Sequence, residues 1–176
     1  MRLLALDLGA TLGVAVGDVD AAPTCLHVKM EGTQSAKFLA MYHTVKSLIE
    51  EHRPDHVSIE KAIAYGPAGK EARVEMLMGY RAVVLMCLHV LGYRPPLEVS
   101  VSTARSEFLG RKPPKGKGKQ MVFERCGRIG WDVSNLDESD ACAVWAVARR
   151  KLANKFMPVP EGLFDNANHI DSKPPG

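Results

Sequence analysis

The chain has 176 residues and an ordinary globular composition, with 46% hydrophobic, 24% charged and 6% aromatic residues. This length fits one domain with a full core of its own, and no apolar run approaches the roughly 18 residues that a membrane span needs. The formal net charge is +3, and the four cysteines are scattered without metal-binding or disulfide spacing, so we expect reduced thiols.

The first part of the chain predicts an antiparallel meander of three strands followed by a helix. An apolar run at residues 3–8 is typical of a central strand, and residues 11–17 and 24–30 show strand patterns separated by short turns. Residues 35–52 carry apolar side chains at helical spacing, and Ser35 is positioned to cap this helix.

Helices and strands alternate over the rest of the chain. We expect strands at residues 56–60 and 97–101, and helices at residues 70–91, 103–109, 119–129 and 138–154. Ser102 or Thr103 is the expected cap of the short helix. This order predicts one α/β domain at residues 1–156, with a mixed sheet of five strands flanked by helices. The tail at residues 157–176 is rich in Pro, Asn and Gly and is expected to be poorly ordered.

Positive charge is concentrated in one segment. Residues 102–130 contain eight basic and two acidic side chains, so this segment carries +6 and the rest of the chain −3. Its centre at residues 110–118 has two prolines and three glycines, which predicts a mobile loop. A local basic block predicts an anionic partner at one face of the protein. The alternative is a solvated loop far from any ligand.

Four carboxylates are candidates for a metal site. Asp7 and Glu60 each end an apolar strand, and Asp137 and Asp140 are three residues apart, on one face of the last helix. Each also has a simple structural explanation, as a turn residue, an exposed strand end, an N-cap and a first-turn acid. Together they would repel one another, and Mg²⁺ or Mn²⁺ would compensate. Two such ions about 4 Å apart can promote phosphodiester hydrolysis.

Three stretches of the chain resemble the RuvC-type Holliday junction resolvases of the RNase H-like superfamily. They are L-A-L-D-L-G-A-T-L-G-V-A-V, V-S-I-E-K-A and L-D-E-S-D-A-C-A-V-W-A, which contain the four carboxylates. Their order, their approximate spacing and the basic segment between the second and third agree with the family. The resemblance covers roughly residues 1–150.

The resemblance implies an RNase H-like fold, with a three-stranded antiparallel meander and further parallel strands. It also implies a metal-dependent endonuclease that cleaves Holliday junctions or other branched DNA by hydrolysis and leaves a 5′-phosphate. Asp7, Glu60, Asp137 and Asp140 would be catalytic metal ligands for two Mg²⁺ or Mn²⁺ ions.

The family also has basic residues near the scissile phosphate. Arg105 and Lys119 match those positions, with Lys117 a rival for the second, and Lys119 would be catalytic. Arg105 stands where many members have lysine, and a guanidinium binds phosphate but does not readily donate a proton. The expected DNA-binding residues are Arg105, Arg111, Lys112, Lys115, Lys117 and Lys119.

The helix at residues 70–91 is apolar on more than one face. One face would cover the sheet, and the other is expected to form a symmetric homodimer, as in the resembled family, because a four-way junction has two equivalent strands to cut. The alternative is a central helix buried within one subunit. We expect a cytoplasmic protein of a bacterium, or of the host cell if a phage encodes it.

Three other functions fit part of the sequence. A related nuclease acting on RNA or another nucleic acid would share the carboxylates, and a non-catalytic DNA-binding relative would share the fold. The stretch at residues 7–11 also matches the D-x-G-x-T phosphate motif of ATP-binding proteins of the actin, hexokinase and Hsp70 type. Those proteins need two such domains and a second glycine-rich motif, which 176 residues cannot accommodate.

Overall fold

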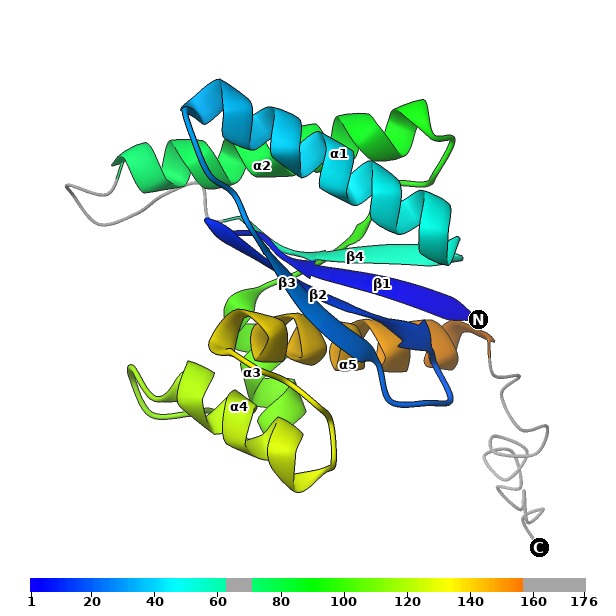
Figure 1. Cartoon of the computed structure of the whole chain (residues 1–176). Helices are drawn as coiled ribbons and strands as arrows, with labels where there is room; N and C mark the ends of the chain where they lie inside the picture. The colour runs from blue at the N-terminus through cyan, green and yellow to red at the C-terminus, as the bar shows by residue number, and fades with distance from the viewer. Residues whose placement is uncertain (63–70, 157–176) are drawn as a thin grey trace, which may run out of the picture.

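Five strands form one mixed sheet in the order β3-β2-β1-β4-β5 (Figure 1). They are β1 (Arg2–Asp7), β2 (Thr11–Asp18), β3 (Thr24–Lys29), β4 (His56–Glu60) and β5 (Leu97–Val99). The first three pair antiparallel, whereas β4 is parallel to β1 and β5 is parallel to β4. The predicted meander and mixed five-stranded sheet are therefore confirmed.

The structure is a computed structural model that describes residues 1–62 and 71–156. The prediction for the tail at residues 157–176 lies outside the described residues. All four cysteines are free thiols, as predicted. Within the described ranges, no helix has both the length and the apolar character needed to cross a membrane.

Five helices cover the two faces of the sheet (Figure 1). They are α1 (Gln34–His52), α2 (Glu71–Val90), α3 (Val101–Leu109), α4 (Gly118–Arg128) and α5 (Leu136–Phe156). Helices α1 and α2 lie on one face, and α3, α4 and α5 lie on the other. Alternate residues of β1 point to opposite faces: Leu4 and Leu6 join the α1/α2 core, and Leu3 and Ala5 join the α5 core. Burial on both faces explains the continuous apolar run of this strand.

Helix α5 runs along the sheet and is the main cover of its second face (Figure 1). Its predicted apolar stripe is buried, namely Ala141, Val144, Trp145, Ala148 and Leu152. The indole Nε1 of Trp145 donates a hydrogen bond to the carbonyl of Leu3 at 3.2 Å, so the last helix is fixed to the first strand. This docking determines where the acids at the start of α5 lie.

Two predicted helix caps were wrong. The N-cap of α1 is Thr33 and not Ser35, and the N-cap of α3 is Ser100 and not Ser102 or Thr103. In both cases the hydroxyl that accepts the backbone hydrogen bond belongs to the residue that still has extended backbone angles. The later hydroxyl residues are already helical, so they cannot act as caps. The earlier start of α3 also shortens β5 to three residues.

Candidate active site

The strand register gathers polar side chains at one edge of the sheet. Asp7 pairs with Gly13, and Gly13 pairs with His27, while the pairing of Leu6 with Ile59 sets Glu60 next to Asp7. Side chains alternate along a strand, so Asp7 faces α5, as Leu3 and Ala5 do. A row of His27, Gly13, Asp7 and Glu60 therefore crosses the four strands β3, β2, β1 and β4 under the start of α5.

Gly13 allows α5 to approach this row. A Cβ atom at this position would lie 2.1 Å from the backbone oxygen of Asp137, so only glycine fits without displacing the helix. Asn135 caps the helix, since its Oδ1 accepts hydrogen bonds from the backbone nitrogens of Asp137 and Glu138, both at 2.9 Å. Asp137 is thus not the N-cap, and its side chain is left for other partners.

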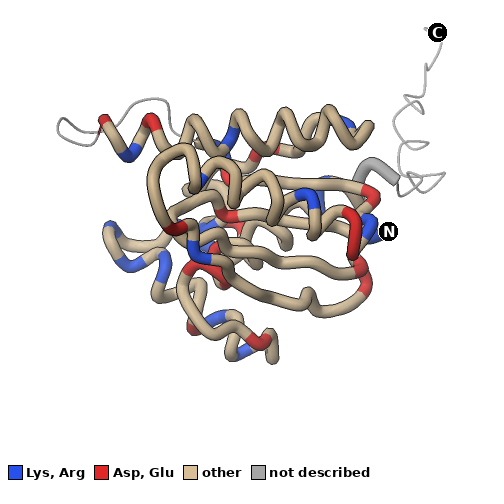
Figure 2. The backbone as a smooth tube through the Cα atoms, turned by 45° about the horizontal axis from the view of Figure 1, so that its top comes forward, with Lys and Arg blue, Asp and Glu red and all other residues tan. Residues whose placement is uncertain are grey.

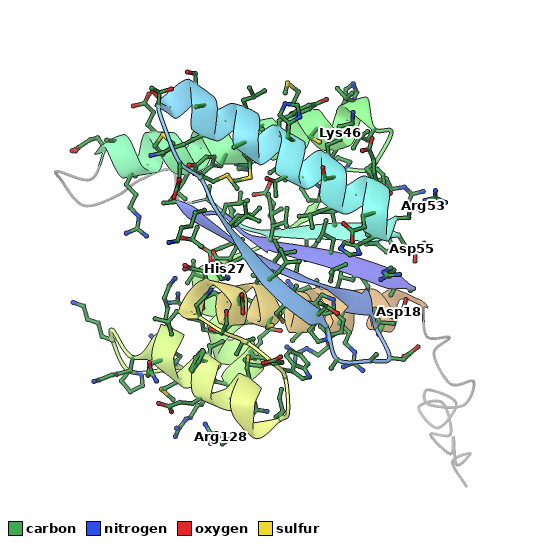
Figure 3. All side chains as sticks on the ribbon, viewed as in Figure 1. Asp18, His27, Lys46, Arg53, Asp55 and Arg128 are labelled. Atoms are coloured by element: carbon green, nitrogen blue, oxygen red, sulfur yellow. The ribbon has the colours of Figure 1, made fainter. Side chains whose placement is uncertain are left out.

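Glu138 attaches the first turn of α5 to β3. Its Oε1 lies 2.6 Å from Nδ1 of His27, which is labelled in Figure 3, and its Oε2 accepts from the backbone nitrogen of Ser134 at 2.6 Å. Burial raises the pKa of Glu138, but hydrogen bonds from His27 and Ser134 outweigh it and leave the pKa below its usual value. The first turn of α5 is therefore fixed both to β3, through His27, and to the preceding loop, through Ser134.

Asp7 and Glu60 form no ion pair within the described part of the chain. Asp7 is only 6% exposed, and burial, followed by the charges of Glu60 and Asp140, raises its pKa well above the usual value. Burial also raises the pKa of Glu60. A hydrogen bond between the two carboxyl groups raises the pKa of Asp7 and lowers that of Glu60, and the charge of Lys119 lowers the pKa of both.

Two cations neutralise the acids of α5. Arg105 of α3 binds both oxygens of Asp140, at 3.0 and 2.8 Å. Lys119, in the first turn of α4, lies 2.9 Å from Oδ1 of Asp137 and 3.2 Å from Oδ2 of Asp140. Burial lowers the pKa of each cation, but the neighbouring carboxylates outweigh it and raise the pKa, so both are charged at neutral pH.

The other predicted DNA-binding residues lie apart from the acids. Arg111, Lys112, Lys115 and Lys117 are exposed on the segment between α3 and α4, and none forms an ion pair within the described part of the chain. Lys119 is therefore the lysine that contacts the acids, and Lys117 is not. Figure 2 shows Lys and Arg positions gathered on the side of the molecule away from the N-terminus, beside a group of Asp and Glu positions.

The donor chemistry of the site fits a hard divalent cation. Asp7, Glu60, Asp137 and Asp140 offer carboxylate oxygens, and the first two form no ion pair among the described residues. As the side chains stand, however, no three potential ligands among the described residues converge on one point. The reason is that Asp137 and Asp140 are paired with Lys119 and Arg105. Holding an ion would require these pairs to loosen.

Comparisons with known proteins agree with this geometry. The solved structure titled "T. thermophilus RuvC in complex with Holliday junction substrate" superimposes with a TM-score of 0.66, covering 88% of this chain and 95% of that one at 17% identity. A protein of Gloeobacter violaceus named crossover junction endodeoxyribonuclease RuvC is 29% identical over 173 residues, or 94% of this chain and 83% of that protein. Over most of its length this chain is similar to RuvC-type Holliday junction resolvases.

The RuvC-type assignment rests on more than one relative. The protein of the same name from Xanthomonas oryzae pv. oryzae strain PXO99A is 27% identical over 155 residues, covering 84% of each chain. The yeast mitochondrial Holliday junction resolvase Ydc2 has a TM-score of 0.56 at 13% identity, covering 88% of this chain and 84% of that one. No family model matches the sequence. The resemblance and the RNase H-like fold predicted from the sequence are confirmed.

Sequence reasoning missed three residues of this candidate site. Gly13, His27 and Glu138 carry no catalytic pattern, and their partners are more than 100 positions away along the chain. One local signal was available for Glu138. An asparagine at residue 135 followed three positions later by glutamate is the pattern of a capping box, which marks the start of a helix.

Proposed function

We propose that this chain is a crossover junction endodeoxyribonuclease, which cleaves Holliday junctions and other branched DNA by metal-dependent hydrolysis of a phosphodiester. The observation that carries the proposal is the meeting of Asp7, Glu60 and Asp140 with the cation Lys119 at one edge of the sheet. Relatives that carry this name, and a neighbouring structure solved with a Holliday junction substrate, support the choice of branched DNA.

The proposed metal ligands are Asp7, Glu60, Asp137 and Asp140, and the proposed ions are Mg²⁺ or Mn²⁺, two per site. When bound, divalent ions supply positive charge opposite the scissile phosphate and increase the acidity of a water molecule. The raised pKa of Asp7 and Glu60 supports this ligand set, because a buried and a half-buried carboxyl group lie side by side without an ion-pair partner among the described residues. Asp137 and Asp140 are held in position by the cap and by Gly13.

Lys119 and Arg105 then have distinct roles. Both now neutralise carboxylates, and both become available to a phosphate once those carboxylates have another partner. Arg105 holds a phosphate with its planar fork of donors but keeps its proton. Lys119 is charged at neutral pH and can stabilise negative charge developing on the phosphate or the leaving oxygen. Lys119 is therefore the proposed catalytic lysine.

The exposed basic segment is proposed to hold the DNA backbone near the branch point. Its four cations, Arg111, Lys112, Lys115 and Lys117, have no carboxylate partner among the described residues. Contacts of this kind go to phosphates, so they position the substrate without reading its sequence. The proposed location of the protein is the cytoplasm of a bacterium, or of a phage-infected host cell.

We also propose a symmetric homodimer formed through α2. Met78, Met86 and Val90 are 37%, 53% and 63% exposed, and their spacing in multiples of four produces one apolar stripe on the outer surface of this helix. Such a stripe on a water-exposed helix is typical of an interface. Met86→Glu should convert a dimer into a monomer in sedimentation at micromolar concentration. A wild-type protein that sediments as a monomer would refute the dimer.

A cleavage assay tests the proposed activity. The protein is incubated with labelled four-way junctions, linear duplex and an RNA–DNA hybrid, each with Mg²⁺ or Mn²⁺. We expect paired nicks in the junction and little cleavage of the other two substrates. Preferential cleavage of the hybrid would indicate an RNA-directed nuclease instead. Tight junction binding without cleavage in either metal would indicate a non-catalytic relative.

A further inference from the structure

A second basic feature lies away from the acids, where α3, α4 and α5 meet. A hollow of about 390 Å³ is lined by Arg125, Arg149 and Arg150, together with Glu107, Phe108 and small residues of α5. We call this feature the arginine groove. Three guanidinium groups around one carboxylate leave it with a net positive charge, and nothing in the proposed cleavage reaction uses it.

Aromatic rings hold two of these arginines in place. The guanidinium of Arg125 lies over the ring of Phe108, and that of Arg149 lies over Trp145, each 5.6 Å from the ring centre. Neither donates a hydrogen bond to a carboxylate or carbonyl in the described part of the chain, and the buried Nε of Arg125 has no partner there at all. Donors held in this way but left unpaired favour an anionic acceptor.

The third arginine closes one wall of the groove. Arg150 of α5 forms an ion pair with Glu107 of α3, which joins the two helices. This pair uses the one carboxylate of the lining, so no acid remains to neutralise Arg125 and Arg149. The groove is thus a fixed concave surface that presents two uncompensated guanidinium groups.

The same helices connect the groove to the candidate active site. Along α5, Arg149 is nine residues beyond Asp140, and along α4, Arg125 is six residues beyond Lys119. At 1.5 Å per residue these separations are roughly 14 and 9 Å. At about 100° per residue, Arg149 also lies on the opposite side of α5 from Asp140, so the groove is a face separate from the acids and a duplex arm would reach it around α5.

We propose that the arginine groove binds the phosphodiester backbone of a duplex arm of the substrate. This inference rests on the proposed function, because it takes branched DNA as the ligand. Planar guanidinium groups suit the two free oxygens of a phosphodiester, and contacts to the backbone hold an arm of any sequence. The groove orients the arm while the acids act at the branch.

The test compares two arginine variants in the cleavage-inactive Asp7→Asn background. The double variant Arg125→Gln/Arg149→Gln is set against Arg128→Gln, an exposed arginine of α4 outside the groove that is labelled in Figure 3. Affinity for a four-way junction is measured across a salt series. We expect the double variant to bind more weakly and to lower the log–log salt slope by about 0.9 per lost phosphate contact, whereas the control matches its parent.

A neutral phosphate in the DNA locates the contact. When methylphosphonates are placed one phosphate at a time along the duplex arms, one group of positions should weaken binding of the Asp7→Asn parent several-fold. They should not weaken the double variant further, because its contact is already lost. Additive losses would overturn the inference. So would an unchanged salt slope, or a double variant that loses affinity for inorganic phosphate while binding the junction normally.

Two further measurements keep the outcomes separate. The single variant Arg149→Lys retains the positive charge, so it should show the same salt slope as the Asp7→Asn parent. A variant that had lost its fold would not show that slope. The proposed function is judged by cleavage with wild-type protein and not by binding. Failure to cleave junctions would refute the nuclease but leave the phosphate contact measurable, and normal cleavage with no effect of the groove variants would refute only the groove.

Discussion

The two faces of the sheet are built from side chains of different size. Towards α1 and α2, β1 and β2 present large aliphatic residues, namely Leu4, Leu6, Leu12, Val14 and Val16. Towards α5 the same strands present Ala5, Gly13 and Ala15 at central positions. Small residues let the backbone of α5 come against the backbone of β2, and the acids meet there. The α1/α2 face mainly forms hydrophobic core, whereas the α5 face brings the acids of the strands and of α5 into contact.

The first prediction concerns the acids of the α5 face, where the largest effect is expected. Asp7→Asn should lower junction cleavage by roughly 10³-fold or more, because it removes a charged metal ligand. Junction binding should change little, since the basic surface remains. Glu60→Gln and Asp140→Asn should behave alike in a single-turnover assay.

Asp18→Asn is the matched control for these variants. Asp18 is an exposed acid at the other end of β2 and is labelled in Figure 3, so its loss should leave cleavage unchanged. Near wild-type cleavage by Asp7→Asn would show that the carboxylates of this face do not bind the catalytic metal.

The second prediction compares one glycine from each layer. Gly13→Ala forces α5 away from β2 and should lower cleavage about 10²-fold, because the acids lose their alignment. Gly79→Ala, on α2, overpacks the ring of Phe38, where the added Cβ would lie 2.3 Å away. Gly13→Ala should cost about 1–3 kcal/mol of unfolding free energy, because the added Cβ meets backbone. Gly79→Ala should cost less, because the end of the Phe38 ring can shift and alanine is favoured over glycine within a helix by about 1 kcal/mol.

Thermal unfolding and cleavage are measured on both glycine variants. We expect Gly13→Ala to lower the melting temperature more than Gly79→Ala, and only Gly13→Ala to lose cleavage at a temperature where both are folded. Equal loss of cleavage would mean that the two faces are not functionally distinct.

The third prediction separates Lys119 from the exposed lysines. Lys115→Ala/Lys117→Ala should weaken junction binding and lower the salt slope by up to about 1.8, at about 0.9 per contact, with little change in cleavage at saturating DNA. Lys119→Ala should chiefly lower the cleavage rate of bound DNA, because it contacts the acids. The reverse pattern would place the catalytic cation on the loop.

The smallest expected effect is on stability. Because the pKa values of Asp7 and Glu60 are raised in the metal-free fold, their contribution to stability is fully present below their ordinary range near pH 4. It is lost as pH rises through the raised values. Mg²⁺ replaces the proton, so the increase in Tm on adding Mg²⁺ should be larger at pH 8 than at pH 5.5.

The same reasoning applies to Asp7→Asn without metal. Removing a buried charge that Glu60 and Asp140 repel should raise Tm at neutral pH by about 2–4 °C, the equivalent of roughly 1 kcal/mol. It should also reduce the Mg²⁺-dependent increase. A lower metal-free Tm for this variant would argue that Asp7 is already compensated in the fold.

Local patterns in the sequence predicted the elements and the acids. Apolar runs ending in Asp7 and Glu60 gave the strands that carry them, and the three-residue spacing of Asp137 and Asp140 gave their common helical face. Both patterns involve residues close together in the sequence, so they can be recognised without knowledge of the fold. The contact of Lys119 with the acids also agreed with its position in the basic segment.

The remaining features depend on pairings across the chain that no local pattern records. Gly13 is an ordinary strand glycine until α5 is docked on it, and His27 meets Glu138 across 111 positions. The arginine groove likewise combines three helices. The helix caps failed for a different reason, since hydroxyl residues cluster near both helix starts and only the backbone angles decide which one acts.

The docking of α5 on β1 has a consequence for biosynthesis. Asp7 lies in the first strand and Asp140 in the last described helix, and Trp145 fixes that helix to Leu3 across 142 positions. A ribosome releases the chain from its N-terminus, so most of the protein has emerged before the second pair of acids can join the first. Nascent and prematurely ended chains therefore lack a complete site, and translation itself delays nuclease activity until the fold is closed.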